Sequence, residues 1–345
     1  MSRTITVIGD GLAGTALALT LAAQGAAVRL IGAAHDTATA LSYGAVAAGP
    51  PSWAWQRLER LHGPLGWRPS GLVLHDARAG LPQSLSRLSQ WLPLPLARID
   101  TPTWMAQRQK ALAAAGVHHL PRRVDALRLQ PDGAWGLELA PIGPGEAALE
   151  ADIVVLAAGA GCRALWPALP PRFRHSWAGV LQVPRDAPAN PWLDQARRGR
   201  IVQPSHWRRP ALEAASATTP EASWIVDAGL APWGQELVVG QISWIPPAAS
   251  ALDPERALEP PDPQWMEERL REGLSQLDPQ LAALAAPYRQ VPVSFCSDGQ
   301  PLVGPVADAP GLWLFAGFSA AFSRVPSQAE ALAPSLLAAA GAKSG

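Results

Sequence analysis

The stretch that decides the fold is Thr4–Ile31, TITVIGDGLAGTALALTLAAQGAAVRLI. Its first part, Ile5-Thr6-Val7-Ile8, is apolar and β-branched, which is typical of a buried parallel strand. The next six residues, Gly9-Asp10-Gly11-Leu12-Ala13-Gly14, match G-x-G-x-x-G, and a helical segment and a second strand at Ala27–Ile31 follow. This order of elements is the context in which the motif predicts a dinucleotide-binding unit, and an ordinary βαβ unit with a Gly-rich turn is the less favoured alternative.

The three glycines have different expected roles. Gly9 permits a tight turn, Gly11 lets the backbone approach a pyrophosphate, and Gly14 lets the helix pack closely on the strand. The free N–H groups at the start of the helix favour phosphates. The acid that usually ends the second strand and binds a ribose hydroxyl is missing, because Gly32 stands there. The sequence therefore supports the pyrophosphate half of the site and leaves ribose recognition open.

Length and charge exclude several classes of function. A chain of 345 residues suggests about two domains. Positive and negative side chains balance to a formal net charge of zero, so we expect no nucleic-acid partner. Cys162 and Cys296 form no metal-ligand pattern or disulfide framework, which fits a reducing, cytoplasmic location. We expect no signal peptide and no membrane span.

After Ile31 the regular alternation of strand and helix stops. The small residues of Leu41–Gly49 suit a backbone that passes close to a ligand. Ser52 is predicted to cap a helix, and a further helix is predicted from Thr101 to Gly116. The first of these helices is predicted to carry Trp53, Leu58 and Leu61.

The remaining strands are predicted from apolar or alternating runs. They lie at 117–120, 124–129, 135–139, 151–156, 177–183, 222–226, 236–244 and 312–316, with strand-like pieces between 72 and 96. Residues 184–209 are predicted to form a Pro/Arg-rich loop, and 262–284 a helix with Trp265, Leu270, Leu274 and Leu277 toward a core. Pro326 is predicted to open the last helix, which runs to Ala340.

Taken in order, several of these segments resemble the FAD-dependent D-amino-acid oxidase and glycine oxidase family, the DAO-type flavoproteins. They are VIGDGLAG, SYGAVAAG, DIVVLAAGAG, WAGVLQV, ELVVGQISW, SDGQPLVG and GLWLFAGFS. The resemblance implies an α/β fold, with a glutathione-reductase-like FAD-binding Rossmann domain and an inserted antiparallel-sheet substrate domain. It places residues 1–50, 98–170 and 290–345 in the FAD-binding domain, and 51–97 and 171–289 in the substrate or lid domain.

The resemblance also implies the cofactor, FAD, and its contacts. The residues expected to hold it are Gly9, Gly11, Leu12, Ala13, Gly14, Ser42, Ala45, Val124, Ala158, Gly159, Gly304, Gly317, Phe318, Ser319 and Ala320. The start of the last helix is expected to face the pyrimidine side of the flavin, where a helix N-terminus stabilises the negative charge of the reduced ring. Ala320-Ala321 stand where relatives are often richer in glycine.

Amino-acid oxidases of the family that this chain resembles usually carry an arginine a few residues before the Asp-Gly of the C-terminal motif, where it binds the substrate carboxylate. Residues 291–298 of this chain contain no arginine. The catalytic residues are therefore unknown, and the candidates are Arg289, His175, Arg174 and Ser319. Arg208 and Arg324 are further candidates for the carboxylate, although a surface position is the more frequent explanation.

Other conspicuous residues have structural explanations that compete with function. His206 belongs either to a lid or to a solvated loop. His118 and His119 are strand neighbours that point to opposite faces, so no metal site is predicted there or elsewhere. Cys296 is expected to be a buried free thiol. Two tryptophans either line an apolar pocket or pack within a sheet: Trp224 and Trp244.

The sequence thus predicts an FAD-dependent oxidoreductase that oxidises a C–N bond of a small amine or amino-acid-like substrate by hydride transfer to the flavin. One alternative is a flavin-dependent dehydrogenase or reductase acting on a substrate without a carboxylate, which the missing arginine favours. Another is a degenerate, non-catalytic relative that binds FAD. The expected partner is a small molecule, and the sequence does not indicate its identity, the electron acceptor or the oligomeric state.

Overall fold

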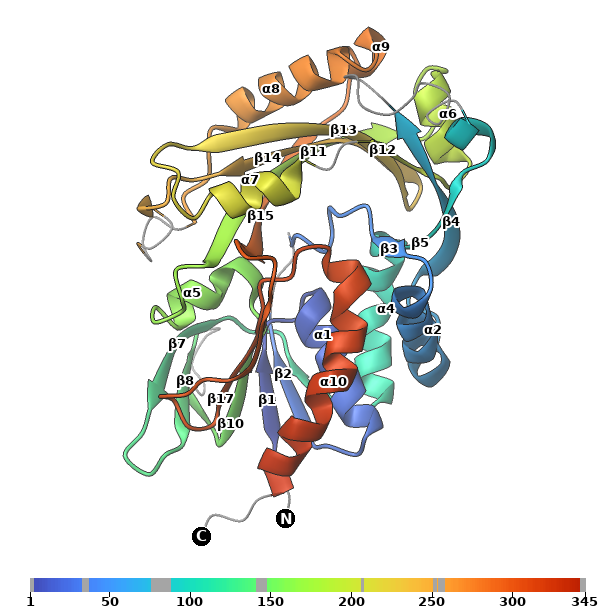
Figure 1. Cartoon of the computed structure of the whole chain (residues 1–345). Helices are drawn as coiled ribbons and strands as arrows, with labels where there is room; N and C mark the ends of the chain where they lie inside the picture. The colour runs from blue at the N-terminus through green and yellow to red at the C-terminus, as the bar shows by residue number, and fades with distance from the viewer. Residues whose placement is uncertain are drawn as a thin grey trace.

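The computed structural model describes residues 3–32, 37–75, 88–140, 148–205, 208–250, 253 and 258–341. Three sheets organise the chain: one of six strands, one of eight and one of three. Figure 1 shows the six-stranded sheet in the lower half of the molecule, with both termini below it, and strands of the eight-stranded sheet across the top. The fold is therefore mixed α/β, with a parallel and an antiparallel layer facing each other.

The six-stranded sheet has the order β16-β17-β10-β1-β2-β6. Its strands are β1 (Ile5–Ile8), β2 (Val28–Ile31), β6 (His118–Leu120), β10 (Ile153–Leu156), β16 (Leu302–Pro305) and β17 (Leu312–Ala316). All neighbours pair in parallel except β16, which is antiparallel to β17 at the edge. Strands β1 and β10 are buried along their whole length, as continuous apolar runs in a covered parallel sheet should be.

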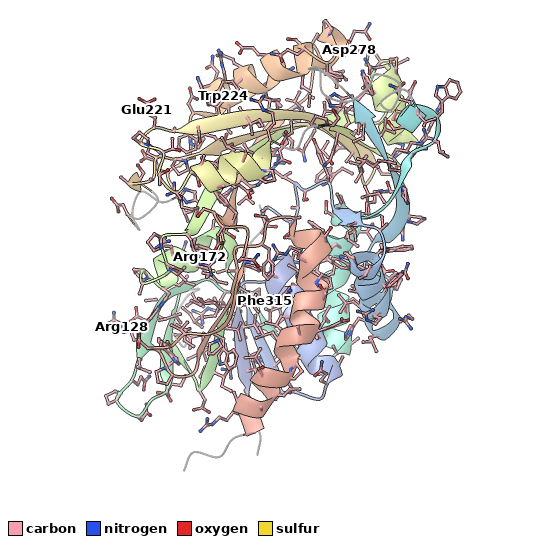
Figure 2. The ribbon with its side chains drawn as sticks, viewed as in Figure 1. Arg128, Arg172, Glu221, Trp224, Asp278 and Phe315 are labelled. Atoms are coloured by element: carbon pink, nitrogen blue, oxygen red, sulfur yellow. The ribbon has the colours of Figure 1, made fainter. Side chains whose placement is uncertain are left out.

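Different layers cover the two faces of this sheet. Helices α1 (Leu12–Ala23), α4 (Thr101–Ala114) and α10 (Ala321–Gly341) pack on one face, in the apolar cluster that contains Val7 and Phe315. The three-stranded sheet of β7 (Val124–Leu129), β8 (Trp135–Leu139) and β9 (Ala148–Ala151) packs on the other, with Ile8 and Leu314. Alternate residues of each strand thus enter different cores. Figure 2 shows Phe315 beside α10.

Helix α10 starts earlier than the sequence predicts. It begins at Ala321, so Pro326 lies inside the helix rather than at its opening. Proline has no N–H to donate to the carbonyl of Phe322, four residues before it. The indole Nε1 of Trp55 donates to that carbonyl oxygen instead, at 2.6 Å. A side chain from another helix therefore satisfies the group that proline leaves open.

Helix α2 (Pro50–His62), which carries Trp55, also differs from its prediction. Gly49 flanks its start, so Ser52 lies within the first turn and does not cap it. The buried face carries Trp55 and Leu58, whereas Trp53 and Leu61 are 57% and 67% exposed. The helix predicted to carry Trp53, Leu58 and Leu61 is therefore confirmed, and of these three residues Leu58 faces the core.

The eight-stranded sheet has the order β15-β11-β14-β13-β12-β4-β5-β3. Its strands are β3 (Ala45–Ala47), β4 (Trp67–His75), β5 (Leu94–Ile99), β11 (Phe173–Pro184), β12 (Ile201–Pro204), β13 (Ser223–Trp233), β14 (Glu236–Ile245) and β15 (Tyr288–Cys296). All pairs are antiparallel except β12 with β4. Helix α8 (Pro263–Ser275) lies above the sheet in Figure 1, and α7 (Arg209–Ala215) lies below it.

The segment predicted as a Pro/Arg-rich loop contains regular structure. It holds α6 (Pro191–Arg197) and the whole of β12, and α7 begins at its last residue, Arg209. The side-chain oxygen of Asn190 accepts hydrogen bonds from the amides of Trp192 and Leu193, which caps α6 despite the surrounding prolines. The predicted helix at 262–284 is two helices, α8 and α9 (Pro279–Ala282). Short elements with prolines at their first positions carry weak periodic patterns, which explains both errors.

The last elements connect the sheets. A 3₁₀ turn, Gly159–Gly161, and α5 (Cys162–Leu165) follow β10 and lead into β11. Of the helices in the described ranges, none is long and apolar enough to cross a membrane.

Candidate functional site

The ends of the parallel strands meet at one edge of the six-stranded sheet. The amide of Gly9, just after β1, donates to Ile31 O at 2.7 Å, and the amide of Gly32, just after β2, donates to Leu120 O at 3.0 Å. The amide of Ala157, after β10, donates to Ile8 O at 2.8 Å. In open α/β sheets, ligands bind outside the carboxyl ends of the strands. This edge is therefore the candidate site.

Two glycines of the G-x-G-x-x-G motif are required by the protein itself. Gly9 has φ +108°, and a Cβ on it would lie 2.4 Å from Ala157 O. A Cβ on Gly14 would lie 1.8 Å from Gly9 O, so the helix could not approach the strand. Both observations agree with the roles expected from the sequence, a tight turn and close packing.

Gly11 is different. Its φ is −70°, which any residue adopts, and among the described residues a Cβ on it would meet only Thr39 Oγ1, at an ordinary 3.6 Å. Neither backbone conformation nor packing therefore requires glycine at this position. A bound group that approaches the backbone closely does require it, and Leu12 and Ala13 follow at the start of α1, where the helix dipole favours an anion.

The segment after β2 lies beside this helix start. The amide of Leu12 donates to Thr39 Oγ1 at 3.0 Å, which satisfies one of the free N–H groups of α1. Ser42 lies three residues further on, and its carbonyl accepts a bond from Thr101 at 3.3 Å. Ala45 opens β3, and the amide of Ala47 donates to Ser323 Oγ at 2.9 Å. Ser42 and Ala45 are thus held between the start of α1 and the first turn of α10.

The loop after β10 lies directly against the glycine motif. A Cβ on Gly9 would lie 2.7 Å from the Cα of Ala158, so the two loops touch. Gly159 has φ +56°, and no described atom lies within 4 Å of the position that its Cβ would take. Val124, the first residue of β7, is buried in the cluster that contains Ile8 and Ile31. These residues lie at or near the same sheet edge.

The loop between β17 and α10 supplies the other predicted contacts. Gly317 has φ +77°, and a Cβ on it would lie 2.5 Å from the sulfur of Cys296, so packing alone requires this glycine. The ring of Phe318 is buried against Phe315, with centroids 4.9 Å apart. Among the described residues, Ala320 is the one non-glycine residue with positive φ, at 52°. Gly304 pairs with Leu314 beside this loop, and open space surrounds its Cβ position in the described structure.

The eight-stranded sheet presents a polar row on the face that looks toward this edge. Asp227 on β13 pairs with Gln241 on β14, so the two side chains share a face. Arg289 on β15 pairs with Val180 on β11, on that same face by alternation along the strands. Arg289 is three strands from Asp227, or about 14 Å. The row therefore has a cation at one end and a carboxylate at the other.

Helix α7 joins this row to the loop before α10. Ser319 Oγ donates to Glu213 Oε2 at 2.8 Å, and Arg209 Nε donates to Glu213 Oε1 at 2.8 Å. Burial raises the pKa of Asp227, while nearby Arg209 and Arg208 lower it. The phenol of Tyr43 is buried, and burial and then the charge of Asp227 raise its pKa. Asp227 of the sheet thus lies near the charged side chains of α7 and the neutral phenol of Tyr43, and Glu213 of α7 binds Ser319 of the loop.

The candidate catalytic residues do not form one group. Arg289 Nε donates to Gln182 Oε1 at 3.2 Å, on the face toward the strand ends. Arg174 lies on the same face but about 20 Å away along β11, where it donates to the carbonyls of Pro246 and Ala248. His175 lies on the opposite face, and burial, Arg174 and Arg163 lower its pKa to about 4. Its Nε2 has no hydrogen-bond partner in the described structure.

Other residues singled out in the sequence take structural places. Cys296 is a buried free thiol, as predicted. Trp224 and Trp244 share the face that α8 covers, and Trp224 contacts Trp265 of that helix edge to face, which favours sheet packing over a ligand pocket. Figure 2 shows Trp224 below α8. Arg324 donates to the Gly299 carbonyl at 2.7 Å. His206 lies outside the described residues.

Sequence reasoning missed three groups at this site. Asp10 forms a buried ion pair with Arg108, Glu213 binds Ser319 of the β17–α10 loop, and Asp227 lies near Glu213. An acid between the first two glycines of the motif was a visible signal for Asp10. No signal was available for Glu213 and Asp227, because α7 and the length of β13 were not predicted.

The geometry fits a dinucleotide cofactor. No described atom of the protein closely approaches the position that a Cβ on Gly11 would take, and the start of α1 lies beside this space. The loops after β2, β10 and β17 reach the same edge of the sheet. The family model for FAD-dependent oxidoreductases, DAO, matches residues 75–333. The chain belongs to the DAO family. It is an FAD-dependent oxidoreductase, and FAD is the cofactor of this family.

Solved structures similar to this DAO-family chain have the same fold at low identity. They include glycine oxidase from Geobacillus kaustophilus (14% identity, 98% of this chain and 95% of that chain, TM-score 0.67). Iminodiacetate oxidase from Chelativorans sp. BNC1 is 19% identical (97% and 95%, TM-score 0.60), and L-proline dehydrogenase from P. horikoshii is 15% identical (97% and 93%, TM-score 0.61). No curated protein matches the sequence.

Proposed function

We propose that this enzyme oxidises the C–N bond of a small amine or amino-acid-like substrate by hydride transfer to FAD. The observation that carries the proposal is the polar row above the sheet edge, in which Arg289 and Asp227 offer a cation and a carboxylate on one face. An amino acid has the complementary pair of charges. The names of the similar structures, glycine oxidase, iminodiacetate oxidase and L-proline dehydrogenase, point to the same class of substrate.

The proposal divides the chain into two parts. A glutathione-reductase-like FAD-binding domain would comprise residues 1–50, 98–170 and 290–345, and an inserted substrate domain 51–97 and 171–289. In support, all strands of the six-stranded sheet fall within the first set of ranges. Strands β3 and β15 fall mostly in that set as well but pair in the eight-stranded sheet, so the chain would cross between the domains near these strands.

The cofactor would lie along the strand ends. Gly9, Gly11, Leu12, Ala13 and Gly14 would hold the pyrophosphate, with Ser42, Ala45, Ala158 and Gly159 beside it and Val124 near the adenine. Gly304 and the Gly317–Ala320 loop would approach the flavin, because α10 begins directly after this loop and its N-terminus favours negative charge. When bound, FAD supplies the acceptor for the hydride.

The protein's own residues would position the substrate. Arg289 is exposed on the sheet face and would form a charge-assisted bond with a carboxylate. Val293 lies four residues after Arg289 on β15 and on the same face of the sheet. It belongs to the stretch 291–298, in which the family's arginine was expected. The cationic group would thus be displaced along the strand by about 13 Å, which favours a longer substrate or one bound in another orientation.

A second candidate is an amine without a carboxylate. It is favoured by the absence of arginine from residues 291–298 and by two acids, Glu213, which binds Ser319 of the loop, and Asp227, which lies near Glu213. A protonated amine would be attracted to these carboxylates without any partner for a substrate anion.

A single experiment separates the two. The purified enzyme with bound FAD is mixed without oxygen with glycine, sarcosine, iminodiacetate, proline, D- and L-amino acids, and matched amines that lack the carboxylate. The visible flavin band is followed. Bleaching by the acids and not by the matched amines supports the first proposal. Bleaching by the amines alone supports the second, and no bleaching by any member contradicts both.

A further inference from the structure

We propose that Asp10, inside the glycine loop, supplies the acid that binds the adenosine ribose of FAD. Dinucleotide-binding folds carry this acid at the end of the second strand, where this chain has Gly32. The inference rests on the proposed binding of FAD at the glycine loop, and it concerns the half of the cofactor that the three glycines do not explain.

The position of Asp10 explains why Gly32 is glycine. A Cβ on Gly32 would lie 2.6 Å from the carboxyl carbon of Asp10 and 2.6 Å from its amide nitrogen. The φ of Gly32 is not in the left-handed region, so its backbone does not require glycine. The Asp10 side chain therefore lies across the end of β2 and excludes any side chain there. The acid has not been lost from this place but comes from the neighbouring strand end.

Three elements hold Asp10 in position, two through its carboxylate and one through its backbone carbonyl. Arg108 Nη2 on α4 lies 3.3 Å from Asp10 Oδ2, and His119 Nε2 on β6 lies 3.6 Å from the same oxygen. Arg108 also donates to the backbone carbonyl of Asp10, and Thr15 Oγ1 donates to it at 2.9 Å. Asp10 and Arg108 are 3% and 6% exposed. A residue fixed from so many sides has little freedom to lose when a ligand binds.

The charge of this group suits a ribose. Burying a carboxylate is costly unless it is paired, and Arg108 provides that pairing. An ionised carboxylate has about four acceptor sites, so it can accept a hydrogen bond from a ligand in addition to those from its protein partners. A ribose hydroxyl is a neutral donor, and its bond to a charged acceptor is stronger than a bond between neutral groups. Asp10 therefore offers this sheet edge the same chemistry as the usual acid on β2.

The experiment moves the acid between the two strand ends. Four proteins are prepared without cofactor: the wild type, Asp10→Ala, Gly32→Glu and the double variant Asp10→Ala/Gly32→Glu. FAD affinity is measured by the change in flavin fluorescence, AMP affinity by competition with FAD, and stability by thermal unfolding without ligand. Asp10→Asn, which keeps the size of the side chain and removes its charge, is measured in parallel, because Asp10→Ala leaves the buried Arg108 without this partner.

We expect Asp10→Ala and Asp10→Asn to weaken FAD and AMP binding by about 10- to 100-fold. Gly32→Glu alone should lower thermal stability, because its side chain meets Asp10. The double variant should regain most of the FAD affinity, because its acid returns to the end of β2.

Two outcomes overturn the inference: FAD affinity in Asp10→Asn within about twofold of the wild type, or a double variant that binds no better than Asp10→Ala. Wild-type protein that binds AMP but not FAD refutes the proposed function. In that case the AMP affinities of the wild type and the Asp10 variants decide whether Asp10 binds the adenosine ribose. Wild-type protein that binds neither ligand overturns both.

Discussion

The strand ends of the six-stranded sheet and the lower face of the eight-stranded sheet differ in the part of the chain that would contact a ligand. At the strand ends, backbone geometry makes the site: Gly9 and Gly14 allow close approach, and Gly11 leaves space that packing does not need. On the sheet face, side chains make the site, with Arg289, Gln241 and Asp227 in a row across four strands. The first site would bind a cofactor through a shape that only glycine permits, and the second would recognise a substrate through charges that many residues could provide.

This difference teaches where the chain tolerates change. A backbone site fails when any side chain is added, whereas a side-chain site can be moved along a strand in steps of two residues without altering the fold. If Arg289 takes the role of the arginine missing from residues 291–298, as proposed, the displacement would be such a step, taken twice. The predictions below test each region with changes that should leave the other intact.

The largest expected effect is at His175, on the opposite face of the eight-stranded sheet from the polar row. The folded protein keeps this side chain neutral down to about pH 4, whereas the unfolded chain gains a proton near its usual pKa of about 6.5. Between these values the unfolded state binds more protons, so the free energy of unfolding falls as the pH falls from about 6.5 to about 4, by on the order of 3 kcal/mol. Denaturant unfolding at a series of pH values measures this slope.

His175→Gln should flatten that slope, because glutamine does not titrate. His118→Gln removes an exposed histidine and serves as the matched control, with the slope preserved. An unchanged slope in His175→Gln would show that another group causes the acid sensitivity.

The next effect concerns the hydrogen bond between helices α2 and α10. Trp55→Phe removes the indole N–H that satisfies the carbonyl of Phe322, and Pro326 cannot replace it. A buried carbonyl without a donor costs about 2 kcal/mol, which should appear as a lower unfolding midpoint in urea. The exposed Trp53, changed to Phe in the same way, should cost little. Equal losses in the two variants would mean that the bond does not stabilise α10.

A smaller effect is expected from Arg289. Arg289→Ala should weaken binding of a carboxylate substrate by about tenfold, because a charge-assisted bond is lost. The affinity of Arg289→Lys should lie between those of the wild type and Arg289→Ala. The measurement is the substrate concentration that half-saturates the rate of flavin bleaching without oxygen. Arg128→Ala removes an exposed arginine far from the row, as Figure 2 shows, and is the control. A loss confined to the maximal rate, with unchanged half-saturation, would contradict a role in carboxylate binding.

The smallest effect is at the loop before α10. Ala320 has φ 52°, which costs alanine more than glycine, so Ala320→Gly should stabilise the protein by about 0.5–1 kcal/mol. The adjacent Ala321 is the first residue of the helix, and Ala321→Gly should destabilise it. Urea unfolding of the two variants should give opposite signs. The same sign in both would mean that the left-handed conformation of Ala320 carries no strain.

The sequence predicted the first region far better than the second. The glycine motif, the strands on either side of it and the buried strand at 151–156 are local patterns, so their physics is visible in a short window. In this region the sequence did not predict the position of Asp10. The contact between Asp10 and the end of β2 at Gly32 depends on two strand ends that meet in space. On the sheet face, α7 was not predicted, and the row formed by Arg289 and Asp227 depends on the pairing of distant strands. Register across four strands has no local signature.

The central claim is that Gly11 leaves room for FAD at the strand ends, and one comparison tests it most directly. Visible absorption spectra are recorded for purified wild type and Gly11→Val after incubation with FAD and removal of the excess. A Cβ at Gly11 meets only ordinary contacts in the described structure, so the variant should fold, as its thermal unfolding without cofactor will show. We predict about one flavin per chain in the wild type and none in the variant. A folded Gly11→Val protein that retains stoichiometric FAD would contradict the account.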